Sequence, residues 1–106
     1  MIKVEVVCQK NNNISQIKVW DHAESGEYGF DLVCAGVSSI MIGALNALNE
    51  LDYPFNYEIS PRPLILIEWS GSDEKQEMMK IIYYQLKTIE EQYGNYIKII
   101  EKEEFQ

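Results

Sequence analysis

One histidine and one cysteine in the first third of the chain have side chains that could do chemistry together. Eleven residues separate His22 from Cys34, and His22 is the only histidine in the sequence. A thiol is strongly nucleophilic only when ionised, and an imidazole can accept its proton. A connection of this length can bring its two ends within hydrogen-bond distance, because the entropy cost of loop closure rises only slowly with length. The spacing therefore permits a catalytic pair.

The element that would hold the cysteine is a helix. Apolar residues recur at three- and four-residue steps from Val33 to Leu51, which predicts a helix over 33–51. Asp31 would then cap the helix or orient His22, and Cys34 would fall in the first turn, where unpaired backbone N–H groups stabilise a thiolate or an oxyanion. Ser38, one turn further on, either lines the site or only packs.

The segment before this helix, residues 21–32, lacks a sustained period and is predicted to be a loop. Loops of about a dozen residues inside a compact domain are often functional. We expect this loop to gate the site for a substrate, through the glycines and aromatic residues Gly26, Gly29, Tyr28 and Phe30. Tyr28, Phe30 and Met41 are expected to shape the pocket.

Two other interpretations of the same residues stay open. From spacing alone, a cysteine such as Cys34 is more often a small buried core residue, and a lone histidine such as His22 is more often a surface or hydrogen-bonded side chain than a base. Zinc could take His22, Cys34, Cys8 and a carboxylate such as Asp31, but their spacing matches no common zinc pattern, so no metal and no other cofactor are expected. With two cysteines in the chain, both are expected to be thiols, and Cys8 a structural one.

The remaining pattern predicts an α+β fold. The length of 106 residues is typical of a single domain, here 1–106. The predicted elements are strands at 2–8 and 14–20, the helix at 33–51, strands at 55–59 and 64–69, a helix opening at 71–73 and stopping at Gly94, and a strand at 95–101, with a frayed tail from Lys102. This β-β-α-β-β-α-β order predicts a two-layer sandwich with both helices on one face of a mixed sheet. A stripe of small residues on the first helix, Gly36, Ser39, Gly43 and Ala47, would let another backbone approach closely.

The charge pattern bears on the partner. The net charge is −8, and no lysine or arginine lies between Lys18 and Arg62, while seven acidic residues do. Such a chain is unlike a nucleic-acid binder, which needs clustered basic residues. The acidic region is either a solvated face or attracts a basic partner. Because the start shows no signal-peptide pattern and no run of about eighteen unbroken apolar residues predicts a membrane span, the cytoplasm is the expected compartment.

The motif around the candidate pair resembles a known family. Its residues are His22-Ala23, Gly26, Gly29, Asp31, Val33-Cys34-Ala35 and Ser38. This string is similar to that of the ribosomal-processing cysteine proteases, the Prp family, and the likeness extends over the whole chain in length and in its order of elements. One departure is Asp21, which stands where the family has glycine before the histidine.

The resemblance implies an activity. His22 would be the general base and Cys34 the nucleophile of a cysteine endopeptidase that removes the N-terminal extension of the twenty-seventh large-subunit ribosomal protein. It also implies a homodimer. The alternative from another class is a non-catalytic, ribosome-associated binding module in which the cysteine and the histidine are structural.

Overall fold

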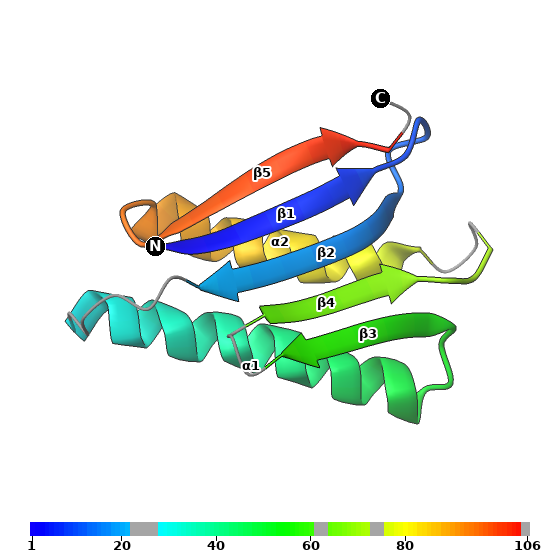
Figure 1. Cartoon of the computed structure of the whole chain (residues 1–106), viewed down its shortest axis with the longest axis horizontal. Coiled ribbons are helices and arrows are strands. Elements are labelled where there is room, and N and C mark those ends of the chain that lie inside the picture. The colour runs from blue at the N-terminus through cyan, green and yellow to red at the C-terminus, as the bar shows by residue number, and fades with distance from the viewer. Residues whose placement is uncertain (22–27, 61–63, 73–75, 105–106) are drawn as a thin grey trace.

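The computed structural model describes residues 1–21, 28–60, 64–72 and 76–104, and it has the predicted order of elements. His22 and Gly26 lie outside the described residues, as do the side chains of Asp21, Tyr28 and Phe30. Figure 1 shows how the strands and helices are arranged in space. They are β1 (Ile2–Cys8), β2 (Ile14–Asp21), α1 (Tyr28–Glu50), β3 (Phe55–Ser60), β4 (Leu64–Trp69), α2 (Glu77–Tyr93) and β5 (Ile97–Glu103).

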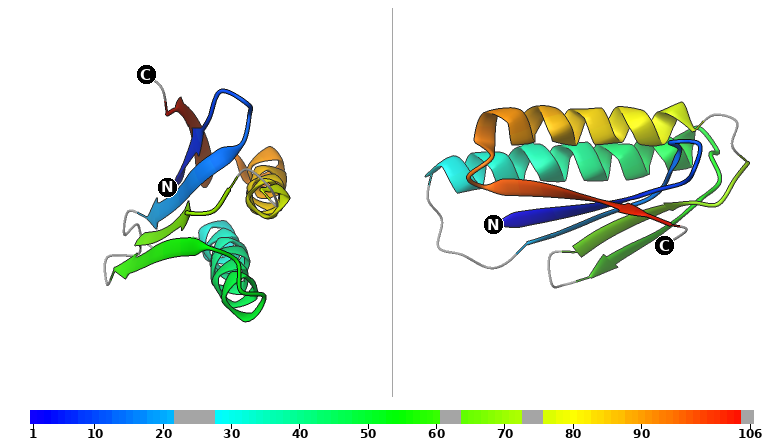
Figure 2. Two further views of the ribbon diagram at one scale, coloured as in Figure 1. Left: turned by 90° about the vertical axis from the view of Figure 1, so that its right-hand side faces the viewer. Right: turned by 90° about the horizontal axis from the view of Figure 1, so that it is seen from above.

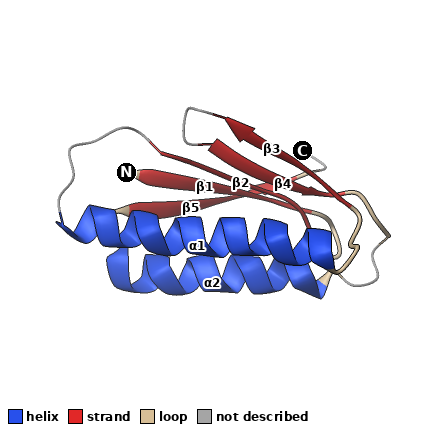
Figure 3. Cartoon of the chain, turned by 90° about the horizontal axis from the view of Figure 1, so that it is seen from below, coloured by secondary structure: helices blue, strands red, loops and turns tan. Residues whose placement is uncertain are grey.

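The strands form one mixed sheet in the order β3-β4-β2-β1-β5. β1 pairs with β5 in parallel, and the other pairs are antiparallel. Both helices lie on the same face of this sheet, side by side, as the end-on view of Figure 2 and the view from below in Figure 3 show. The α+β sandwich predicted from the sequence is confirmed.

The core lies between the sheet and the helices. It consists of the inward-facing residues of alternate strand positions and of one stripe on each helix, which is the arrangement that the two periodicities predict. The side chains buried most completely are Ile17, Met41, Leu48, Ile67, Met79, Leu86, Ile97, Val4, Val6 and Val33. Leu51, predicted as the last residue of the α1 stripe, instead follows the helix and is 61% exposed.

The start of α1 corrects the sequence prediction most strongly. The helix begins at Tyr28 rather than at Val33, so Asp31 lies in its first turn and is not the N-cap. Gly29 suggested a loop, but a glycine costs little in a first turn, where an acidic residue such as Asp31 is favoured by the helix dipole. The backbone of Tyr28, Gly29 and Phe30 is therefore helical and not part of a gating loop.

Two other boundaries also differ. α2 begins at Glu77, and the residue before it, Gln76, makes no side-chain cap; its side-chain carbonyl accepts the backbone N–H of Ile14 at 2.9 Å. This bond ties the first strand hairpin to α2. β5 runs to Glu103, so Lys102 is not frayed: it pairs with Val7 of β1 and forms an ion pair with Glu5 at 3.2 Å.

Among the described residues, one helix segment, Asp31–Glu50 of α1, is long and apolar enough to cross a membrane. Here it covers the sheet, and one stripe of it forms part of the core. The small-residue stripe beside it faces α2 in part. A side-chain carbon at Gly36 would lie 3.3 Å from the terminal methyl of Ile89, whereas one at Gly43 would meet nothing within 4 Å.

A partly buried carboxylate, Glu90, joins α2 to the edge strand β5. It accepts the backbone N–H of Ile99 at 2.6 Å and the ammonium group of Lys87 at 2.9 Å. Burial would raise the pKa of Glu90, but these two hydrogen bonds outweigh it and lower the pKa. The carboxylate form is therefore the one that fits the folded protein.

We expect Glu90→Gln to lower the free energy of unfolding at pH 7 by about 1–2 kcal/mol, because it weakens charge-assisted hydrogen bonds. The folded pKa lies below the unfolded one, so the contribution of Glu90 is complete above the unfolded value of about 4.3 and disappears as the pH falls through the folded pKa. Urea unfolding at pH 7 and pH 3 measures this, and the gap between wild type and variant should be smaller at pH 3 than at pH 7. Glu91→Gln, at the exposed neighbouring position, is the matched control, and an equal loss there would contradict the role of Glu90.

Candidate active site

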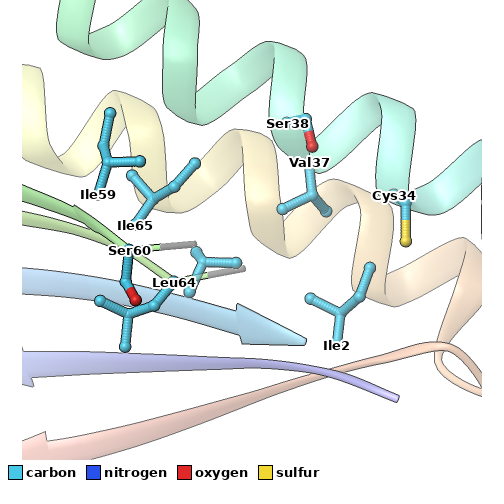
Figure 4. Close-up of a pocket in the computed structure, with 9 residues that line it drawn as sticks. Ile2, Cys34, Val37, Ser38, Ile59, Ser60, Leu64 and Ile65 are labelled. Atoms are coloured by element: carbon cyan, nitrogen blue, oxygen red, sulfur yellow. The ribbon is translucent and has the colours of Figure 1, made fainter. Parts of the chain in front are cut away.

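Cys34 lies on the side of α1 that faces the sheet. It is half-buried and packs against the core, and its sulfur atom points from the helix toward the sheet (Figure 4). Val33 and Val37, on either side of it in the helix, are buried, so the helix cannot turn about its axis without losing core contacts. The position of the thiol is therefore fixed by the packing of α1.

The thiol lines a pocket of about 210 Å³, here called the Cys34 pocket. Its walls come from five elements and are mostly aliphatic, with two hydroxyl groups, those of Ser38 and Ser60 (Figure 4). An apolar pocket with a few polar groups is the usual form of a small ligand site. The lining residues are Ile2, Val19, Cys34, Val37, Ser38, Ile59, Ser60, Leu64 and Ile65.

The longer helix changes how Cys34 could be activated. Cys34 comes six residues after Tyr28, so it is in the second turn and beyond the unpaired N–H groups of the first. Because the effect of the helix dipole falls off within the first turn, the helix contributes little to a thiolate at this position. The prediction that Cys34 lies beside the unpaired N–H groups of the first turn is therefore wrong. A nearby base is needed to ionise the thiol.

The end of β2 brings the chain next to this pocket. Asp21 is the last residue of β2, and its backbone pairs with Ile2, which lines the Cys34 pocket; Val19 of the same strand lines it too. His22 follows Asp21 directly in the sequence. β2 thus ends beside the wall of the Cys34 pocket, one residue before His22 in the sequence.

Of the other residues predicted to belong to the site, some line the Cys34 pocket and some do not. Ser38 lines the pocket, one helical turn from Cys34, whereas Asp31 is exposed in the first turn of α1. Met41 is completely buried in the core and is not a pocket residue, because the turn of helix that carries it packs under the sheet.

The hairpin of β3 and β4 supplies a wall that the sequence interpretation missed, comprising Ile59, Ser60, Leu64 and Ile65. These residues follow Cys34 by more than twenty positions, and only the strand order places them beside α1. The alternation of apolar residues in 64–69 was a signal for a strand, but it carried no information about the neighbour of that strand.

Cys8 is remote from this site. It ends β1, whereas Ile2 at the start of the same strand lines the Cys34 pocket, and a seven-residue strand spans about 20 Å. Burial, and then the charges of Glu101 and Glu103, raise the pKa of the Cys8 thiol. Both cysteines are thiols, and the described residues contain no group of His, Cys, Asp and Glu side chains that could hold a metal ion. A zinc site that joins Cys8 to Cys34 does not form.

Comparison with known proteins identifies the family. Residues 1–98 match the family model described as cysteine protease Prp. This chain belongs to the Prp family. A relative from Staphylococcus aureus, named ribosomal processing cysteine protease Prp, is 31% identical over 93% of this chain and 97% of its own length. A protein of the same name from Bacillus subtilis is 38% identical over 45% of this chain and 43% of its own length.

Solved structures of similar proteins support the assignment of this chain to the Prp family. Prp from S. aureus in complex with a substrate peptide superposes with a TM-score of 0.86 at 28% identity, covering 96% of this chain and all of that one. A protein from Streptococcus mutans superposes with a TM-score of 0.80 at 26% identity, covering 98% of this chain and 96% of that one. The chain is therefore a cysteine protease, a hydrolase, that acts in ribosomal processing, and the alternative of a non-catalytic binding module is not supported.

Proposed function

We propose that this chain, as a single domain over 1–106, removes the N-terminal extension of the twenty-seventh large-subunit ribosomal protein, with Cys34 as nucleophile and His22 as general base. The observation that carries the proposal is the placement of the Cys34 thiol in an apolar pocket beside the end of β2, which His22 follows in the chain. The reaction is hydrolysis of one peptide bond and needs no cofactor.

The chemistry has two steps. The Cys34 thiol gives its proton to the imidazole, and the thiolate attacks the carbonyl carbon of the scissile bond. The imidazolium then protonates the leaving amine as the C–N bond breaks, which leaves a thioester on Cys34. In the second step the imidazole takes a proton from water and the hydroxide attacks the thioester carbonyl. The C–S bond breaks, the acid product leaves, and the imidazolium returns the proton to the Cys34 sulfur. A solved structure of S. aureus Prp that carries a covalently linked product peptide supports this choice of mechanism.

Two further residues have proposed supporting roles. The hydroxyl of Ser38 lines the same pocket, where it can hydrogen bond to the substrate backbone. Asp31 is in the first turn of α1, close in sequence to the pair, and is proposed to orient the imidazole. The homodimer, the cytoplasmic location, the absence of nucleic-acid binding and the gating role of Gly26 stay predictions.

The test is cleavage of the ribosomal protein with its extension, followed by the intact masses of the products. We expect a single cut that removes the extension. Because the region between Lys18 and Arg62 carries only acidic charges and the N-terminal region of a ribosomal protein is typically basic, kcat/KM should fall about tenfold between low and high salt. A substrate whose extension has glutamine in place of lysine and arginine is the control and should show a flat salt profile. An intact substrate after prolonged incubation would refute the assignment, whereas cleavage with an equal salt response for both substrates would refute the steering alone.

A further inference from the structure

A second hollow lies on the same side of α1 as the Cys34 pocket. It occupies about 250 Å³ between α1 and the edge strand β3 and is here called the α1–β3 groove. Its lining combines apolar side chains with two amides and consists of Ile42, Leu45, Asn46, Asn49, Phe55, Tyr57 and Ile59. In the end-on view of Figure 2, α1 runs beside β3 at one edge of the sheet. The groove is thus bounded by a helix on one side and an edge strand on the other.

The groove and the Cys34 pocket are neighbours that share one wall residue. Ile59 lines both of them, and Figure 4 shows its side chain on the β3 side of the Cys34 pocket. On α1 the pocket uses residues 34, 37 and 38 and the groove uses 42, 45, 46 and 49, which form one helical face. The centres of these two sets are about nine residues apart, or about 14 Å along the helix axis. An extended peptide covers this distance in about four residues, and residues four apart point to the same side of a strand.

The charges near the groove indicate which kind of polypeptide it would bind. None of the described residues that line the groove is charged, but the segment 28–60, which contains both walls, has no lysine or arginine, and its acidic residues are Asp31, Glu50, Asp52 and Glu58. A basic polypeptide would be attracted to these walls, whereas a second copy of this acidic chain would meet like charges. β3 is also the last strand of the sheet, so its outer backbone groups can pair with an extended peptide.

We propose that the α1–β3 groove is an extended substrate-binding site that takes an apolar side chain of a basic, extended peptide, about four residues from the side chain held in the Cys34 pocket. This inference rests on the proposed function and adds a specificity determinant to it. The size of each hollow fits one large side chain, since a cavity of about 150 Å³ accommodates a benzene ring. Recognition at two separated points would let the enzyme select one site in a long tail.

The experiment compares two peptides with each variant. The long peptide carries about eight residues on each side of the scissile bond, and the short one about two, which cannot reach the groove. The groove variants are Ile42→Lys and Tyr57→Thr. Each has a control with the same substitution on α2: Ile81→Lys, where the exposed fraction is 52% against 41% at Ile42, and Tyr84→Thr, where it is 64% against 62% at Tyr57.

We expect the ratio of kcat/KM for the long peptide to that for the short one to fall about tenfold in Ile42→Lys, and by less in Tyr57→Thr, through a higher KM for the long peptide. The α2 controls should keep the wild-type ratio. Equal ratios in groove and control variants would overturn the proposal. So would conversion of a dimer to a monomer by Ile42→Lys at an unchanged ratio, measured by sedimentation, because the groove would then hold a second copy. Failure of the wild type to cut either peptide would instead overturn the proposed function on which the groove depends.

Discussion

Cys34→Ala is expected to lower kcat/KM for extension removal by at least about 10⁴-fold, because the loss of a nucleophile removes the covalent route altogether. Cys34→Ser should be nearly as inactive, since a hydroxyl is far less readily ionised than a thiol at neutral pH. Both substitutions are small and lie at a half-buried position, so they should preserve the fold. Product formation by mass spectrometry, with circular dichroism as a check on folding, measures the effect.

Cys8→Ala is the control for this prediction. Cys8 lies at the opposite end of β1 from the Cys34 pocket, and its raised pKa keeps the thiol protonated at neutral pH. Cys8→Ala should therefore cleave at the wild-type rate. Iodoacetamide at pH 7 should label wild type and Cys8→Ala faster than Cys34→Ala. Rapid cleavage by Cys34→Ala would show that Cys34 is not the nucleophile. Loss of cleavage by a folded Cys8→Ala protein would contradict the assignment in the same way.

Local periodicity explains why most of the fold could be predicted from the sequence. The alternation in Ile2–Cys8 and the three- and four-residue steps after Val33 each report one buried face, and the structure buries those faces. The boundaries were less predictable, because the ends of elements depend on distant contacts. β5 reaches Glu103 since β1 is there to pair with it, and Gln76, just before α2, makes a hydrogen bond to Ile14, which lies far away in the sequence.

The site was predictable only in part. The spacing of Cys34 and Ser38 on one helix places them together, and they do line one pocket. The opposite wall depends on β4 lying next to β2, which sets Leu64 opposite Trp20 in the register. Pairing between distant strands leaves little trace in a single sequence, so neither Ile59 nor the groove that it shares could be inferred before the strand order was known.

The packing that fixes the site should also dominate stability. Leu48→Ala is expected to lower the free energy of unfolding by about 2–5 kcal/mol, because it removes buried methyl groups and leaves a cavity under the sheet. Leu48 is completely buried on the α1 stripe that also holds Val37, a wall of the Cys34 pocket. For a domain of this size a loss of 3 kcal/mol corresponds to a fall in Tm of about 12–24 °C. Thermal and urea unfolding followed by circular dichroism measure both quantities.

Leu51→Ala makes the same chemical change three residues later and provides the contrast. Its side chain is 61% exposed beyond the end of α1, so less apolar surface leaves a buried environment and the loss should stay below about 1 kcal/mol. The sequence pattern alone treats the two leucines as equal members of one stripe, whereas the structure separates them. Equal destabilisation by the two substitutions would mean that α1 continues along the sheet past Glu50, and the end of the helix that borders the α1–β3 groove would then be misplaced.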